Sequence, residues 1–74
     1  MNKTHLTQNK VILKYLQSHK RGVTSMDAFE KFHITRLAAR VFDLRKMGYP
    51  IQTIREVKND ADGQTIQYAR YVLE

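Results

Sequence analysis

A chain of 74 residues is long enough for one domain, and because it has no cysteine, disulfide bridges and thiolate metal sites are excluded. The hydrophobic fraction of 42% argues against wholesale disorder, and no apolar run approaches the ~20 residues that span a bilayer. Thirteen Lys and Arg against seven Asp and Glu give a formal charge of +6, which favours a polyanionic partner, although such charge also aids solubility. The polar start Met1–His5 does not have the pattern of a signal peptide, so we expect a soluble, cytoplasmic protein that does not bind membranes.

The first predicted element is a helix from Thr7, its N-cap, to about Lys20, with residues 1–6 as a flexible arm before it. Gly22 is a natural end for this helix. We expect residues 7–74 to form a single domain. The helix has a wide apolar face formed by Val11, Ile12, Leu13, Tyr15 and Leu16.

Two further helices are predicted in close succession after a short extended link at Gly22–Thr24. Ser25 is the expected N-cap of a helix that runs to about Phe32. Thr35 is the expected N-cap of a third helix at about 35–47, and Gly48 ends it. The turn between them has His33 where such turns often have glycine, and histidine tolerates the left-handed conformation better than most residues.

From Pro50 onwards the pattern changes from helical to extended. We predict a strand at Ile51–Lys58 from its apolar points Ile51, Ile54 and Val57. A second strand is predicted at Thr65–Leu73, which is rich in β-branched and aromatic residues. The turn cluster at 59–63 joins them into an antiparallel hairpin. Three helices followed by a C-terminal hairpin predict the α+β class.

The third helix has two different faces when its residues are placed at roughly 100° each. The predicted inner arc consists of Leu37, Ala38, Val41 and Leu44, and Phe42 falls at the boundary. The predicted outer arc consists of Thr35, Arg36, Ala39, Arg40, Asp43 and Lys46.

The outer arc suits the major groove of DNA. Small Ala39 permits close approach, and Arg36 and Arg40 have the reach to contact guanine edges or phosphates. The Thr35 hydroxyl, beside the helix N-terminus, suits a phosphate. An ordinary solvated helix is the alternative, since Asp43 is placed to pair with Arg40. Arg45 lies nearer the apolar arc, and we expect its head to meet an acid such as Asp27 or Glu30.

The run from Thr35 to Ile51, TRLAARVFDLRKMGYPI, resembles the core of the small winged helix-turn-helix proteins common in bacteriophages and prophages. Its layout is also similar to the DNA-binding domains of the arginine and biotin repressors. The resemblance implies an α+β winged helix-turn-helix fold, three helices with the hairpin as wing. It also implies a groove-facing side formed by Thr35, Arg36, Ala39, Arg40 and Lys46.

The wing has charges of both signs. Its tip contains Asp60 and Asp62, which phosphates repel, so Arg55 and Lys58 on the first strand are the better candidates for DNA contact. We therefore expect a wing whose tip barely touches DNA.

Taken together, these features predict double-stranded DNA binding by a small transcriptional regulator that inserts the third helix in the major groove. No catalytic residue, metal or cofactor is expected, because the histidines are far apart and no nucleophile has a neighbouring base. Useful DNA specificity suggests a homodimer or cooperative arrays of the protein. The alternatives are an architectural factor in excision or replication control, and a protein-binding module such as a phage-encoded inhibitor of a host protein. Single-strand binding through Tyr68 or Tyr71 is a further alternative.

Overall fold

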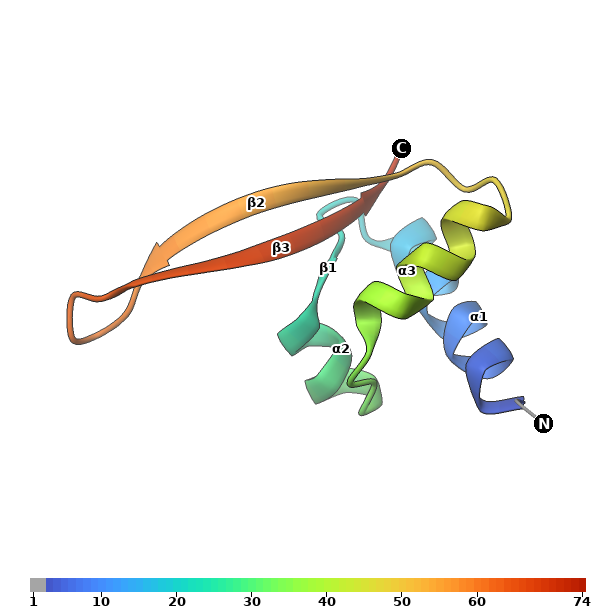
Figure 1. Ribbon diagram of the computed structural model, residues 1–74, viewed down its shortest axis with the longest axis horizontal. Helices are drawn as coiled ribbons and strands as arrows, with labels where there is room; N and C mark the ends of the chain where they lie inside the picture. The colour runs from blue at the N-terminus through green and yellow to red at the C-terminus, as the bar shows by residue number, and fades with distance from the viewer. Residues whose placement is uncertain (1–2) are drawn as a thin grey trace.

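The computed structural model describes residues 3–74, with side chains from residue 7 onwards. Its elements, in chain order, are α1 (Lys3–Ser18), β1 (Val23–Thr24), α2 (Ser25–Phe32), α3 (Leu37–Lys46), β2 (Ile51–Asn59) and β3 (Thr65–Leu73). The strands form one antiparallel sheet in the order β1-β3-β2. The predicted α+β architecture of three helices and a C-terminal hairpin is confirmed (Figure 1).

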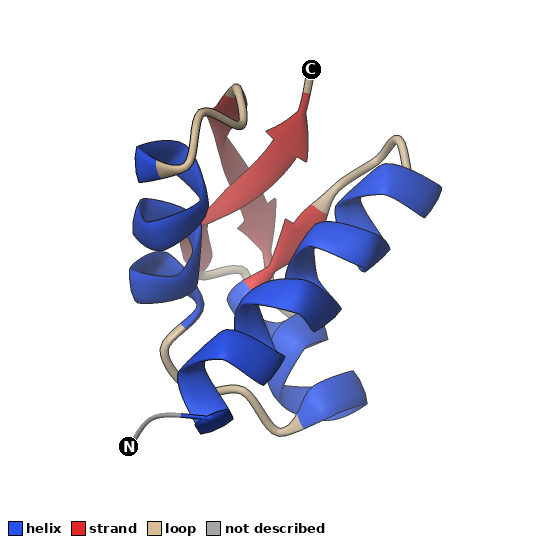
Figure 2. Ribbon diagram, turned by 90° about the vertical axis from the view of Figure 1, so that its right-hand side faces the viewer, coloured by secondary structure: helices blue, strands red, loops and turns tan. Residues whose placement is uncertain are grey.

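The core lies between the three helices and the base of the sheet. Figure 2 looks from the end opposite the hairpin tip, with the helices in front and the hairpin running back behind them. The buried apolar side chains are Ile12, Leu16, Val23, Ala28, Ile34, Leu37, Val41, Leu44 and Ile51. Within residues 3–74, no helix is both long enough and apolar enough to cross a membrane.

The start of α1 differs from the prediction. The helix begins at Lys3, so Thr7 lies inside it and is not its N-cap. Of the predicted arm at 1–6, residues 1–2 lie outside the described part, and residues 3–6 belong to the helix backbone. The signal at Thr7 was misleading because a threonine can also occupy a helix interior, at a small cost in helix propensity.

The helix-turn-helix is formed by α2, a short turn and α3. Thr24, one residue before the predicted cap Ser25, is the N-cap of α2, and it forms a capping box with Asp27. Thr24 Oγ1 accepts from the Asp27 amide at 3.1 Å, and the Asp27 carboxylate accepts from the Thr24 amide at 3.2 Å. At the other end His33 has φ 57° and ψ 29°, so it takes the left-handed conformation that this turn demands.

The third helix is shorter than the predicted 35–47. Its N-cap is Arg36, which makes no side-chain capping bond, so the prediction that Thr35 caps this helix is wrong. The carbonyl oxygen of Arg36 accepts from the amides of Ala39 and Arg40 at 3.1 and 3.2 Å. Gly48, with φ 103°, ends the helix as predicted.

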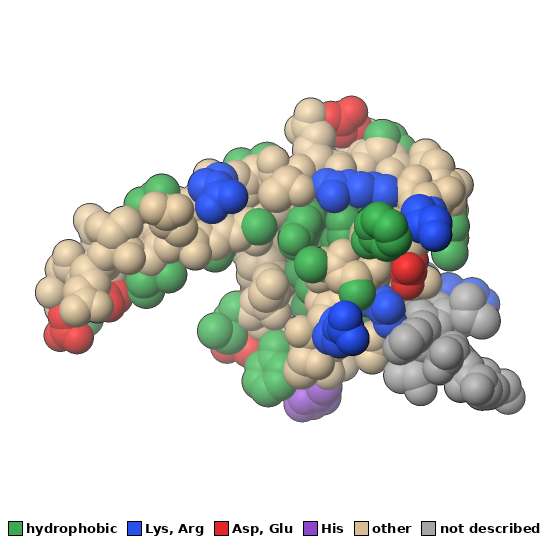
Figure 3. All heavy atoms as spheres, in the orientation of Figure 1, with side chains coloured by type: hydrophobic (Ala, Val, Ile, Leu, Met, Phe, Trp, Pro, Cys, Tyr) green, Lys and Arg blue, Asp and Glu red, His purple; other side chains and the backbone are tan. Residues whose placement is uncertain are grey.

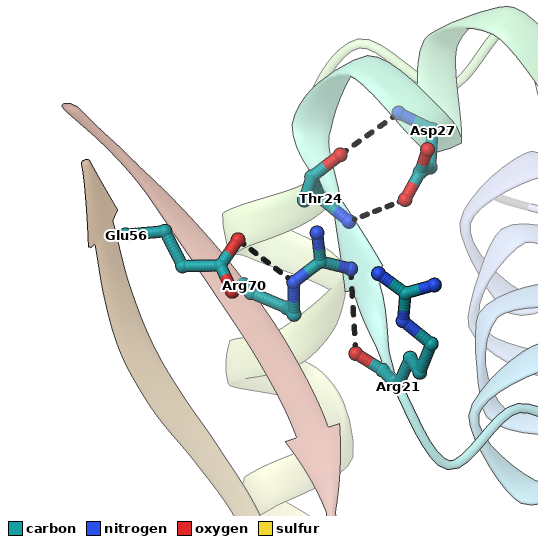
Figure 4. Close-up of polar contacts among 5 residues, drawn as sticks. All are labelled: Arg21, Thr24, Asp27, Glu56 and Arg70. Atoms are coloured by element: carbon teal, nitrogen blue, oxygen red, sulfur yellow. Dashed lines mark hydrogen bonds and ion pairs between the residues drawn. The ribbon is translucent and has the colours of Figure 1, made fainter. Parts of the chain in front are cut away.

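The hairpin is a long arm that extends from the helices, and the molecule measures 43 × 25 × 19 Å (Figure 1). Arg70 on β3 fixes its base (Figure 4): its Nε donates to Glu56 of β2 at 2.9 Å, and its Nη1 donates to the carbonyl of Arg21 at 3.4 Å. This one side chain therefore connects both strands of the hairpin to the chain just before β1.

The ion pair between Glu56 and Arg70 predicts a pH-dependent contribution to stability. The hydrogen bond from Arg70 holds the pKa of the Glu56 carboxyl below its ordinary value. A lowered carboxyl pKa contributes stability above the ordinary value, and that stability is lost as the pH falls through the lowered one. We expect Glu56→Gln to be less stable than wild type at neutral pH, and this difference to vanish as the pH falls through the lowered pKa of Glu56.

Urea unfolding followed by far-UV circular dichroism, at a series of pH values, checks this prediction. A difference between the two proteins that stayed constant down to the acid limit would show that the charge of Glu56 contributes nothing.

Candidate nucleic-acid interface

The buried side of α3 determines which of its side chains face solvent. Leu37, Val41 and Leu44 are each about 1% exposed and pack into the core. Phe42 and Lys46, on the opposite side of the helix, are exposed. We call the exposed surface on and around this helix the α3 face, which consists of Thr35, Arg36, Ala38, Ala39, Phe42, Arg45 and Lys46.

The α3 face is basic with an apolar centre. Phe42 is 60% exposed, and the Lys46 ammonium lies 5.4 Å from the centroid of its ring. Arg36 and Arg45 are also exposed. Figure 3 shows Lys and Arg side chains over α3 and on the hairpin, on one face of the molecule. Such a surface complements a polyanion at its rim and an apolar group at its centre.

The predicted exposed position of Arg40 is wrong. Arg40 is only 6% exposed, and its Nη2 lies 3.3 Å from the carboxylate of Asp43. Asp43 also accepts from the side-chain amide of Asn9 on α1, at 3.4 Å. Arg40 Nε has no hydrogen-bond partner among the described residues. Arg40 thus belongs to the contact between α1 and α3, and we do not assign it to the DNA interface.

Arg45 makes contacts that the sequence did not predict. Its Nε donates to the carbonyl of Ile51 at 2.9 Å, and its Nη2 donates to the Thr53 hydroxyl at 2.8 Å. Neither of the predicted acids is its partner, because the start of β2 passes closer to the end of α3. These two bonds hold the guanidinium between α3 and the hairpin. Its remaining N–H groups donate to no other described residue, so they can contact a phosphate.

The two predicted wing cations lie on opposite faces of β2. Arg55 is an even number of positions from Thr53, which accepts from Arg45, so Arg55 continues the basic surface of the α3 face onto the hairpin. Lys58 has the opposite parity. It lines a groove with Met26 of α2 and Ile66 of β3. The structure therefore brings Arg55, and not Lys58, together with the α3 face.

The acidic tip of the hairpin is held by its own carboxylate. Asp60 Oδ1 accepts from the amides of Asp62 and Gln64, both at 2.9 Å, and the Asp60 amide donates to the carbonyl of Gln64 at 2.8 Å. Asp60 therefore stabilises the turn that the sequence predicts at 59–63.

The sequence analysis placed Phe42 at the boundary of the two arcs because it counted Ala38 as an inner residue. Ala38 is exposed, whereas the branched aliphatic residues of the helix are all buried. If the inner direction is taken from Leu37, Val41 and Leu44 alone, Phe42 and Lys46 fall opposite it and Arg40 moves to the inner boundary. The signal was present, but alanine is a poor indicator of burial.

Comparison with known protein families agrees with this geometry. The family model described as "Winged helix-turn-helix domain" matches residues 7–74 of the chain. The chain belongs to this family. Winged helix-turn-helix domains generally bind DNA and are typically not enzymes. Searches of the curated proteins and of the solved structures give no significant match.

Proposed function

We propose that this winged helix-turn-helix protein binds double-stranded DNA by placing the α3 face in the major groove, and that it acts as a small transcriptional regulator. The observation that carries the proposal is the exposed cationic rim of that face, formed by Arg36, Arg45 and Lys46. Arginine and lysine at such positions neutralise phosphates and contact guanine edges.

The remaining residues of the face have supporting roles in this proposal. Thr35 is exposed and has a hydroxyl for a phosphate, and Ala39 leaves room for a base edge. Arg55, on the hairpin, contacts the phosphate backbone of the DNA, while the acidic tip of the hairpin points away from the DNA. Because a single small module buries limited area, we propose that two copies act together as a homodimer or on adjacent sites.

The test is a titration of the purified protein into a fluorescent random-sequence duplex over a series of salt concentrations. With three or four phosphates neutralised, the logarithm of the binding constant should fall with the logarithm of the salt concentration at a slope of about −2.7 to −3.6. A folded protein that did not bind at low salt would contradict the proposal.

A second candidate function is binding of a protein partner. Met26, Ile66, Tyr68, Lys58 and Arg70 line a groove of about 450 Å³ between α2 and the hairpin. Met26 is 62% exposed and Ile66 is 45% exposed. An apolar peptide segment with an acidic side chain fits this lining. An inhibitor of another protein would use this groove, whereas an excision or replication factor would use the same DNA-binding surface as a regulator.

A further inference from the structure

The side chain of Phe42 is not needed by the core. It is 60% exposed in the middle of α3, and it is not among the partly buried apolar residues that pack against the core. Phe32, on α2, does pack there, and its ring meets Tyr15 edge-on with centroids 5.6 Å apart. Phe42 therefore presents apolar surface to solvent at the centre of the basic α3 face.

The surroundings of Phe42 leave its ring accessible. Ala38, one turn before it, is exposed and too small to cover the ring, and Ala39 is half-buried. On the other side, one turn later, the Lys46 ammonium lies 5.4 Å from the ring centroid. The ring is thus an apolar spot beside a cation, and a partner must present an apolar group close to negative charge.

The major groove of DNA offers one such group. Thymine has a methyl group at C5 on its major-groove edge, a group that no other base presents there. The phosphates at the groove walls supply the neighbouring negative charge. When cations at the rim of the α3 face contact the phosphates on the groove walls, the centre of that face lies against the base edges on the groove floor.

We propose that Phe42 is a specificity-determining residue of this protein, which contacts the C5 methyl groups of thymines in the major groove, with Ala38 giving the ring access. This inference rests on the proposed function, because it assumes that the α3 face enters the groove. The contacts of Arg36, Arg45 and Lys46 do not depend on the thymine methyl group, and Phe42 adds a preference for thymine at the central positions of the site.

Replacement of thymine by uracil tests the inference, because uracil lacks only the methyl group and keeps the base pairing and the O4 acceptor. A random-sequence duplex pool is enriched by binding to the wild-type protein. The enriched pool is then amplified once with dTTP and once with dUTP, and both products are titrated by fluorescence anisotropy. We expect wild type to bind the thymine pool about three- to tenfold more tightly than the uracil pool.

Two variants complete the experiment. Phe42→Ala should bind the two pools equally, with an affinity close to that of wild type for the uracil pool. Arg36→Ala should bind both pools more weakly but keep the wild-type ratio, since it removes a charge and leaves the ring in place. Phe42 and Arg36 are both exposed, and unfolding curves verify that the variants are folded.

The outcomes separate this inference from the proposed function. Salt-dependent binding with equal affinity for the two pools overturns the role of Phe42 and leaves DNA binding intact. A thymine preference that survives in Phe42→Ala also overturns it, because another residue must then contact the methyl group. Absence of binding to either pool overturns both proposals.

Discussion

Replacement of Arg36 and Lys46 together by alanine is expected to weaken binding to a random-sequence duplex by about 10- to 100-fold at moderate salt. Both side chains are exposed on the α3 face, so the double variant neutralises fewer phosphates without opening the core. The slope of the salt dependence should become shallower by about 1 for each phosphate that is no longer neutralised. Fluorescence anisotropy over a salt series measures both quantities.

The matched control removes the same charge elsewhere. Lys20 follows α1 and Lys31 lies on α2; both are exposed and outside the α3 face. Lys20→Ala with Lys31→Ala should keep most of the affinity and the steep salt dependence. If the two double variants bind equally weakly, net charge alone explains the binding and the α3 face has no special role. Arg40 is not a suitable target, because its removal would leave the half-buried Asp43 without its ion-pair partner.

Gly22→Ala is expected to destabilise the fold by about 2–5 kcal/mol, a large fraction of the stability of a small domain. Gly22 has φ 82°, and a Cβ there would overlap the carbonyl oxygen of Tyr71 and lie 2.8 Å from Cγ2 of Val72. The chain before β1 passes directly over β3, so the sheet must shift to accept the added methyl group. Urea unfolding followed by circular dichroism measures the destabilisation.

Gly63 provides a matched control for Gly22. Its φ of 81° is nearly the same, but among the described residues other than its two chain neighbours nothing lies within 4 Å of the added Cβ. Gly63→Ala should therefore cost only the backbone strain, about 1–2 kcal/mol. Equal destabilisation in the two variants would show that the close approach to β3 is unimportant. A larger destabilisation by Gly22→Ala would mean that the extra loss of stability comes from the close contact with β3.

The alternation of side chains along β2 separates Arg55 from Lys58, but it does not say which of the two lies beside the α3 face. The sequence shows that Arg55 and Lys58 are three positions apart, and hence on opposite faces of an extended strand. The sequence does not show which of these two faces of the strand is continuous with the α3 face. The bond between Arg45 and Thr53, which lies on the Arg55 side, answers that question.

Local chemistry explains why so much of the chain could be predicted. The left-handed turn at His33, the end of α3 at Gly48 and the second strand at Thr65–Leu73 depend on residues within a few positions of one another. The same locality accounts for the order of three helices and a hairpin. The predicted cap of α2 was wrong by a single residue, because Thr24 and Ser25 are both good caps and the capping box with Asp27 favours the first.

The elements, their order and the basic character of the third helix could thus be derived from the sequence, because they follow from short-range propensity and composition. Tertiary packing decides instead which arginines of that helix are exposed to solvent. Arg40 is buried because α1 packs beside it and Asn9 contacts its partner Asp43, whereas Arg45 is held by β2. A helical pattern assigns each residue a direction, but the elements that pack around the helix decide which directions meet solvent.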